Sequence, residues 1–209
     1  MKQIFMAALL LLMSIHSAMA FSAVDAFTSA PDVVLPLLPK NTRLDMIDYF
    51  NSGTSIASKN KLDGEARILS LTDKVLRFTM SEVSEYQVVV LKYGKEEIIA
   101  LIETLKTPIA DSRISFYNSR WEPIEKSCFK EPDLKTWLTK VGNKKIDDVR
   151  AALPFMLVQY EYNSEDNTLT LTSNAEQFLS REAYSGISQW LKPSLKYAWN
   201  GKKFTLVKE

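Results

Sequence analysis

The sequence predicts an α+β protein: a mainly antiparallel meander sheet with a packed N-terminal helix, followed by a unit of helices and two β-hairpins. Two observations predict this class. Apolar residues repeat with a helical period in residues 41–53 and with a period of two in residues 75–80. Short stretches containing Gly, Pro and Asp then separate one strand-like run from the next, and connections this short join antiparallel neighbours.

The first twenty residues have the pattern of a secretory signal peptide. Lys2 supplies a basic start, the run from Ile4 to Met13 is apolar, and Ala18 and Ala20 suit the small side-chain pockets of a signal peptidase. The apolar run is shorter than the ~20 residues that span a bilayer, which argues against a membrane anchor. We therefore expect cleavage near Ala20 and a periplasmic or secreted protein, whose new α-amino group is mobile and couples weakly to folding.

Cleavage there would leave a mature chain without histidine, because His16 is the only one. Such a chain has no Ser-His-Asp triad, no Cys-His pair and no histidine-based metal site. It would also lose Lys2, one of 26 basic side chains, and none of the 25 acidic ones, so the formal net charge falls from +1 to zero. Lysines alternate with acidic residues and form no basic stripe in the sequence, so we expect no nucleic-acid partner.

Residues 41–53 have the start and stop signals of a helix. Thr42 and an acidic residue three positions later form a predicted capping box, and Gly53 is the predicted C-terminal cap. Leu44, Ile47 and Phe50 form the expected buried stripe. We expect this helix to cover one face of the sheet that follows.

The sheet is predicted as five strands in succession between about residues 64 and 122. The run from Ile98 to Ile102 is apolar at every position, so we expect its strand to be covered on both faces. The edges that such a sheet leaves exposed are candidate places for a partner to add a strand. Its clearest strand segments are residues 75–80, 86–93, 97–105 and 112–117.

A change in composition near residues 123–133 suggests a soft boundary, which divides the chain into a signal peptide (1–20), a helix plus meander (21–126) and a second unit (127–209) within one or two domains. The second unit is predicted to contain helices, one of them capped by Ser180, and two hairpins. Asn200 and Gly201 predict a type I′ turn in the last hairpin.

Motifs for catalysis are weak. Ser127 and Lys130 have the S-x-x-K spacing of penicillin-interactive serine enzymes, but the sequence lacks the partner motifs. The segment 163–167 gathers oxygen ligands without calcium-loop spacing, which favours a solvated hairpin tip. Cys128, the only cysteine, is interpreted as a buried apolar side chain; the alternative is a thiol for an intermolecular disulfide, activated by neighbouring lysines. We identify no catalytic, cofactor-binding or metal-binding residue.

Three blocks, residues 27–53, 98–121 and 191–204, are distinctive in combination. Through them the mature chain resembles a family of exported proteins known mainly from Bacteroidales, domain of unknown function 3256. The resemblance implies a periplasmic or outer-surface protein of a Gram-negative gut or oral bacterium. It supplies no activity, cofactor or catalytic residue.

For function we favour a non-catalytic binding or protein-interaction module, with a periplasmic or surface protein or a glycan as its unidentified partner. The alternative is a carboxylate-dependent hydrolase that acts on glycans, because 25 acidic residues offer many pairings and folded geometry selects among them. A close carboxylate pair in a cleft beside an exposed Trp or Tyr would favour the hydrolase. Four tryptophans could stack on sugar rings if exposed, although most are interpreted as core or hairpin residues: Trp121, Trp137, Trp190 and Trp199.

Overall fold

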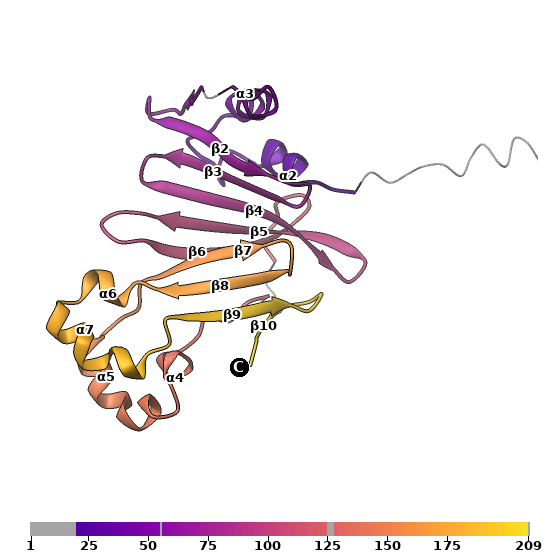
Figure 1. The fold of residues 1–209 in the computed structure, drawn as a ribbon. Helices are drawn as coiled ribbons and strands as arrows, with labels where there is room; N and C mark the ends of the chain where they lie inside the picture. The colour runs from indigo at the N-terminus through magenta and orange to yellow at the C-terminus, as the bar shows by residue number, and fades with distance from the viewer. Residues whose placement is uncertain (1–19, 55, 125–127, 209) are drawn as a thin grey trace, which may run out of the picture.

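The computed structural model describes residues 20–54, 56–124 and 128–208, so the expected signal peptide lies outside the described residues except for Ala20. Two antiparallel sheets form the framework (Figure 1). The first has six strands in sequential order, and the second has four strands in the order β10-β9-β8-β7. The predicted α+β class with a mainly antiparallel meander is confirmed.

The meander follows the predicted alternation closely. A short additional strand, β1 (Ser58–Lys59), extends the first sheet by pairing with the start of β2. The five predicted strands are β2 (Glu65–Leu71), β3 (Val75–Ser81), β4 (Ser84–Tyr93), β5 (Glu96–Leu105) and β6 (Asp111–Asn118).

Strand β5 is covered on both faces, as its apolar run predicts. Ile99 and Leu101 point into one core, whereas Ile98, Ala100 and Ile102 point into another. The first, here the N-terminal core, consists of Ala23, Ala26, Phe27, Ala30, Leu35, Leu38, Met46, Ile47, Ala66, Leu76, Phe78, Met80, Tyr86, Val88, Val90, Ile99, Leu101 and Trp121. The second, the interlayer core, consists of Val75, Val89, Leu91, Ile98, Ala100, Ile102, Cys128, Trp137, Val158, Tyr160, Tyr162, Leu169, Leu171, Leu195, Tyr197 and Phe204.

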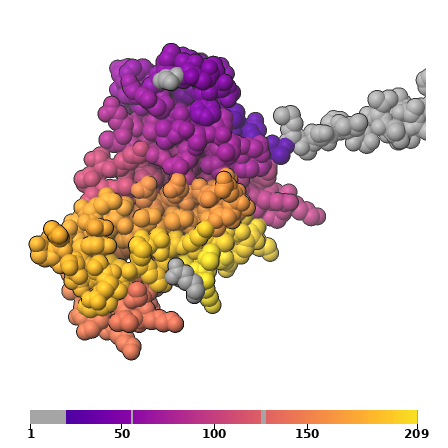
Figure 2. All heavy atoms as spheres, in the orientation of Figure 1, coloured from indigo at the N-terminus to yellow at the C-terminus, as the bar shows by residue number. Residues whose placement is uncertain are grey.

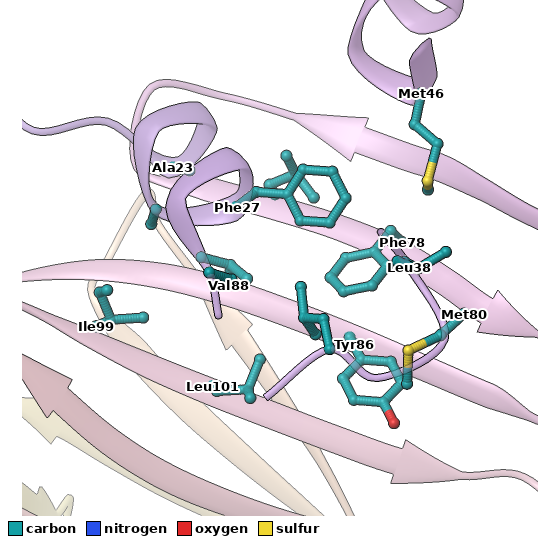
Figure 3. Packing of buried hydrophobic residues seen from close by; sticks show 14 of the residues in the cluster. Ala23, Phe27, Leu38, Met46, Phe78, Met80, Tyr86, Val88, Ile99 and Leu101 are labelled. Carbon is teal, nitrogen blue, oxygen red and sulfur yellow. The ribbon is translucent and has the colours of Figure 1, made fainter. Parts of the chain in front are cut away.

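The helix that covers the centre of the first sheet was not predicted. It is α2 (Ala23–Ser29), which begins at a capping box formed by Ser22 and Asp25. Phe27 of α2 packs in the N-terminal core against Phe78 of β3, with ring centroids 4.8 Å apart (Figure 3). Leu35 and Leu38, from the proline-rich segment after α2, fill the same face and are fully buried.

The predicted helix forms as α3 (Lys40–Asn51), but two of its details were wrong. Pro39 is its N-cap, so Thr42 lies inside the helix and forms no capping box there. Its buried residues are Arg43, Met46 and Ile47, whereas the predicted stripe members Leu44 and Phe50 are 42% and 36% exposed. The reason is position: α2 occupies the middle of the face, so α3 lies over β1 and β2 at the edge.

The C-terminal end of α3 matches the prediction. Gly53 has a φ of +68°, a backbone conformation that glycine adopts without steric cost. Its N–H donates to the carbonyl of Phe50, and the N–H of Thr54 donates to that of Tyr49. This pair of bonds is a Schellman motif.

Both predicted hairpins of the second sheet are present. They are β7 (Val158–Asn163) with β8 (Thr168–Ser173), and β9 (Ser194–Trp199) with β10 (Phe204–Leu206). The predicted type I′ turn is wrong, because Trp199 pairs with Phe204 and leaves a four-residue loop. The side chain of Asn200 accepts the N–H groups of Lys202 and Lys203, which stabilises the wider loop.

Short helices gather beside the second sheet, where their apolar residues form a third, smaller cluster. The predicted cap is confirmed, since the hydroxyl of Ser180 accepts the N–H of Ala183. Within the described ranges, no helix is long and apolar enough to cross a membrane. These helices are α4 (Leu134–Trp137), α5 (Ile146–Ala152), α6 (Ala175–Phe178) and α7 (Arg181–Ile187), with 3₁₀ turns at Gly142–Lys145 and Ser188–Trp190.

The two sheets stack on each other and share the interlayer core (Figure 2). At the margin of the interlayer core, the outer edge of β7 faces polar side chains of the first sheet. Gln87 donates from Nε2 to the carbonyl of Tyr160 (3.1 Å) and accepts the N–H of Tyr162 at Oε1 (3.0 Å). Asp111 accepts the N–H of Val158, and Ser112 accepts that of Tyr160. We call these three side chains and the β7 edge the polar seam.

Candidate ligand-binding cleft

A cleft of about 830 Å³ lies between the α4 segment and the β9–β10 ribbon. Figure 1 shows the C-terminal end of the chain beside α4. This volume falls in the range of about 300–1,000 Å³ that is usual for ligand sites. Its lining consists of Asp133, Lys135, Thr136, Leu138, Thr139, Lys140, Asn143, Lys192, Ser194, Leu195, Lys196, Leu206, Val207 and Lys208.

Backbone hydrogen bonds fix the two walls of the cleft relative to each other. The N–H of Thr139 donates to the carbonyl of Trp190, and the N–H of Lys192 donates to that of Trp137, both at 2.8 Å. Between these bonds, Leu138 and Leu191 form an antiparallel bridge. Trp137 is 1% exposed and anchors this wall in the interlayer core.

The floor of the cleft is apolar and partly accessible. Leu138 and Leu195 are buried beneath it, whereas Leu206 and Val207 are 38% and 43% exposed. The N–H of Val207 donates to the carbonyl of Lys196 at 2.8 Å, which continues the β9–β10 ribbon past the last strand residue. A ligand in the cleft would therefore contact both methyl groups and charged side chains.

Five lysines line the cleft: Lys135, Lys140, Lys192, Lys196 and Lys208. Lys192 donates to the carbonyl of Thr136. Lys196 forms an ion pair at 2.7 Å with Asp166, which is not part of the lining. Lys140 and Lys208 are exposed, and within the described residues neither forms an ion pair. The sequence contains no basic stripe, but in the folded chain these lysines come from separate segments to line one cleft.

Within the described lining Asp133 is the one carboxylate, and it already has hydrogen-bond partners. It caps α4 by accepting the hydroxyl of Thr136 at 2.7 Å and the N–H of Thr136 at 3.0 Å. These bonds hold the pKa of Asp133 below its usual value, and the positive charges of Lys130 and Lys135 lower it further. Asp133 is therefore ionised at neutral pH, and the described lining places no second carboxylate beside it.

One smaller cleft, of about 290 Å³, does contain two carboxylates beside a tyrosine: Glu103, Asp111 and Tyr86. Both carboxylate oxygens of Glu103 are held by Arg113, at 2.6 and 2.9 Å. Asp111 accepts the N–H of Val158 in the polar seam. Tyr86 is 8% exposed, and burial raises its pKa to about 12. Each group thus has a structural role, and the pair does not have the free acid and base that glycoside hydrolysis requires.

The other candidate residues have structural environments. Cys128 is 1% exposed, and burial raises the pKa of its thiol, which contradicts the activating effect expected from neighbouring lysines. Ser127 lies outside the described residues. The segment 163–167 is the tip of the β7–β8 hairpin, as predicted. Trp121 and Trp137 are buried, and Trp190 and Trp199 are half-buried. Across the described ranges, no three His, Cys, Asp or Glu side chains come together as metal ligands.

The lysines of the cleft were missed because they belong to separate segments. Lys135 lies in α4 and Lys140 follows it, Lys192 precedes β9 and Lys196 lies in it, and Lys208 follows β10. The sequence analysis considered only whether lysines form a continuous stripe, and none of these segments contains one. The available signal was the low number of acidic residues after position 182, where only Glu209 occurs.

A solved domain of an uncharacterized protein from Porphyromonas gingivalis W83 has a similar structure. The two align with a TM-score of 0.75 at 22% sequence identity, covering 90% of this chain and 99% of the solved one, which shows a common fold. No curated protein matches the chain significantly. The family model described as "Protein of unknown function (DUF3256)" matches residues 15–204, so the chain belongs to this family, as the resemblance in its sequence predicted.

Proposed function

We propose that the chain is an exported, non-catalytic binding module and that its basic cleft binds an acidic segment of a partner protein. The observation that carries this proposal is the composition of the cleft, with five lysines, one aspartate and an apolar floor. The signal-peptide pattern of the first twenty residues supports export.

The chemistry of the lining favours an acidic peptide over other anions. Lysine ammonium groups are flexible point charges, which suit carboxylates spaced along a chain, whereas arginine forks suit bidentate binding of single phosphates. Leu206 and Val207 offer apolar contact between the charges. The described lining has no aromatic side chain, the platform on which nucleobases stack.

The test is fluorescence anisotropy with a labelled ten-residue oligoglutamate. We expect binding that weakens as salt is added, because exposed charges are screened. The double variant Lys140→Gln/Lys208→Gln should bind roughly tenfold more weakly, since each exposed ion pair contributes up to ~1 kcal/mol. The matched control, Lys59→Gln/Lys95→Gln, removes the same charge from exposed lysines outside the cleft and should bind as the parent does.

Three outcomes would contradict the proposal: no binding, equal weakening in both double variants, or cleavage of the probe detected by mass spectrometry. Tighter binding of an oligoglucuronate than of the oligoglutamate would assign the cleft to anionic glycans. The comparison of the two double variants is clear because both variants have the same net charge.

A further inference from the structure

The backbone N–H of Phe21 points at a carboxylate. It donates to Oε2 of Glu97 on β5 at 2.9 Å, across 76 positions of sequence. The ammonium of Lys74 bonds Oε1 of the same carboxylate at 2.8 Å and the carbonyl of Phe21 at 3.0 Å. Both polar groups of the Phe21 backbone are thus bound by one ion pair of the first sheet.

The neighbouring residues hold Phe21 in this position. The N–H of Ala23 donates to the carbonyl of Asp73 at 2.8 Å, and Ser22 caps α2. The ring of Phe21 packs against the N-terminal core. Phe21 is therefore tied to the sheet by its backbone and its side chain, whereas the sequence analysis expected a terminus at this position to be mobile.

Phe21 is also the residue that directly follows the expected cleavage point. Hydrolysis adds one water molecule across the Ala20–Phe21 peptide bond, which leaves a carboxylate on Ala20 and an ammonium group on Phe21. We propose that Phe21 is the first residue of the mature protein, and that cleavage completes a site in which Glu97 binds its α-ammonium group while Lys74 holds its carbonyl.

The charges around Phe21 support this assignment. Glu97 comes from β5, Asp73 and Lys74 come from the turn between β2 and β3, and Asp25 comes from α2. In the uncleaved chain, Lys74 is the one cation among these groups, against three carboxylates. Cleavage adds a second cation beside Glu97, whose side chain is only 28% exposed. A partly shielded ion pair of this kind is stronger than the bond from the uncharged peptide N–H that it replaces, because both partners then carry a charge.

The first experiment is the mass of the chain purified from the periplasm of an exporting Gram-negative host, which should correspond to a start at Phe21. The second is urea unfolding of a chain that starts at Phe21 and of one that retains Gly-Ser before it, each with and without Glu97→Gln. We expect the folding equilibrium constant of the parent to be about tenfold larger with the free Phe21 terminus, and the two Glu97→Gln forms to be equal.

A pH series distinguishes an effect of the charge on the Phe21 terminus from an effect of removing the residues that precede it. An α-amino group bound by carboxylates has a pKa raised above its usual value of about 7.7–8.0. Its contribution is complete below that value and is lost as the pH rises through the raised pKa. The tenfold advantage of the Phe21 terminus should therefore disappear at high pH.

Glu96→Gln is the matched control, because Glu96 is the exposed neighbour on the same strand. It should keep the tenfold advantage of the free terminus. The proposal is overturned by a mature chain that starts elsewhere, by an advantage that survives Glu97→Gln, or by one that is independent of pH.

Discussion

The two faces of the six-stranded sheet are covered in different ways. On one face, α2 and the proline-rich segment pack apolar side chains into the N-terminal core. On the other face, a second sheet packs over the interlayer core, and the polar seam binds its edge strand β7 through Gln87, Ser112 and Asp111. The helix cover thus relies mainly on apolar contact, beside a buried bond from Nε1 of Trp121 to the carbonyl of Ala26 (3.0 Å), whereas the sheet cover has a series of side-chain hydrogen bonds to β7.

The difference follows from where each element places its backbone polar groups. A helix satisfies its interior N–H and C=O groups itself, so it can lie on a sheet with apolar contacts alone. An edge strand has a row of N–H and C=O groups with no partner in its own sheet, and burying them unpaired costs free energy. The facing sheet therefore has to supply polar side chains at the spacing of a strand.

The largest expected effect is on the apolar face. Phe78→Ala should destabilise the protein by about 3–5 kcal/mol, because Phe78 is fully buried between Phe27 and Tyr86. Chemical unfolding measures the change. Leu69→Ala, at an exposed leucine on the adjacent strand, is the control and should cost less than ~1 kcal/mol. Similar costs for the two variants would contradict the packing described for the N-terminal core.

The second prediction concerns the polar seam. Gln87→Leu keeps the volume of the side chain but leaves the carbonyl of Tyr160 and the N–H of Tyr162 without partners, so we expect a loss of about 2–3 kcal/mol in unfolding free energy. Gln159→Leu changes an exposed glutamine on β7 and should be within ~0.5 kcal/mol of the parent. A neutral Gln87→Leu variant would show that the β7 edge needs no polar cover.

Alkaline pH should weaken both faces, because each has a buried tyrosine. Burial raises the pKa of Tyr86 in the N-terminal core to about 12, and that of Tyr162 in the interlayer core to about 12. An unfolded tyrosine titrates near ~10, so each contribution to stability is complete below that pH and is lost as pH rises through the folded value. At pH ~11, each tyrosine should account for about 1.4 kcal/mol of lost stability.

Tyr86→Phe tests how much of the stability lost at alkaline pH comes from the N-terminal core. The variant should lose about 1.4 kcal/mol less than the parent between pH ~9 and ~11, as measured by urea unfolding at each pH. Leu69→Ala, which removes no titratable group, is the control and should keep the pH dependence of the parent. Equal pH dependence of parent and Tyr86→Phe would contradict the assignment.

The smallest effect is expected at Arg43, a buried charged side chain on the face that α2 and α3 cover. Arg43 is 2% exposed, its Nε and Nη1 are buried without a hydrogen-bond partner, and its nearest carboxylate, Asp32, is 3.9 Å away and exposed. Burial also lowers the pKa of Arg43. Arg43→Met should leave stability within ~1 kcal/mol of the parent or raise it.

The measurement is again urea unfolding, with Arg120→Met as an exposed arginine control. A loss above ~3 kcal/mol in Arg43→Met would show that this guanidinium stabilises the N-terminal core and that the face is not purely apolar in its energetics.

The elements that the sequence predicted correctly are those with local signals. Alternation of apolar residues located the meander, and Ser180 marked the start of α7. Helix α2 also has a local signal, the capping box of Ser22 and Asp25, but with seven residues it is too short for a helical period to be evident. Its position just after a predicted cleavage site drew the interpretation away from structure.

The features that were missed depend on contacts between distant residues. Gln87 is one polar residue in an apolar strand, and its role is visible only beside Tyr160, 73 positions away. The basic cleft likewise forms when the Leu138–Leu191 bridge brings two lysine-bearing segments together. Periodicity and turn residues describe each segment alone, so they predict the layers of this fold but not the surfaces where the layers meet.

The polar seam also gives the protein an internal probe for hydrogen–deuterium exchange. The amides of Val158, Tyr160 and Tyr162 are bonded to side chains of the other sheet, so separation of the layers exposes them while the second sheet stays intact. The amides of β8, which lies between two strands of its own sheet, exchange only when that sheet opens. The difference between the two sets of rates is therefore a direct measure of how often the layers part.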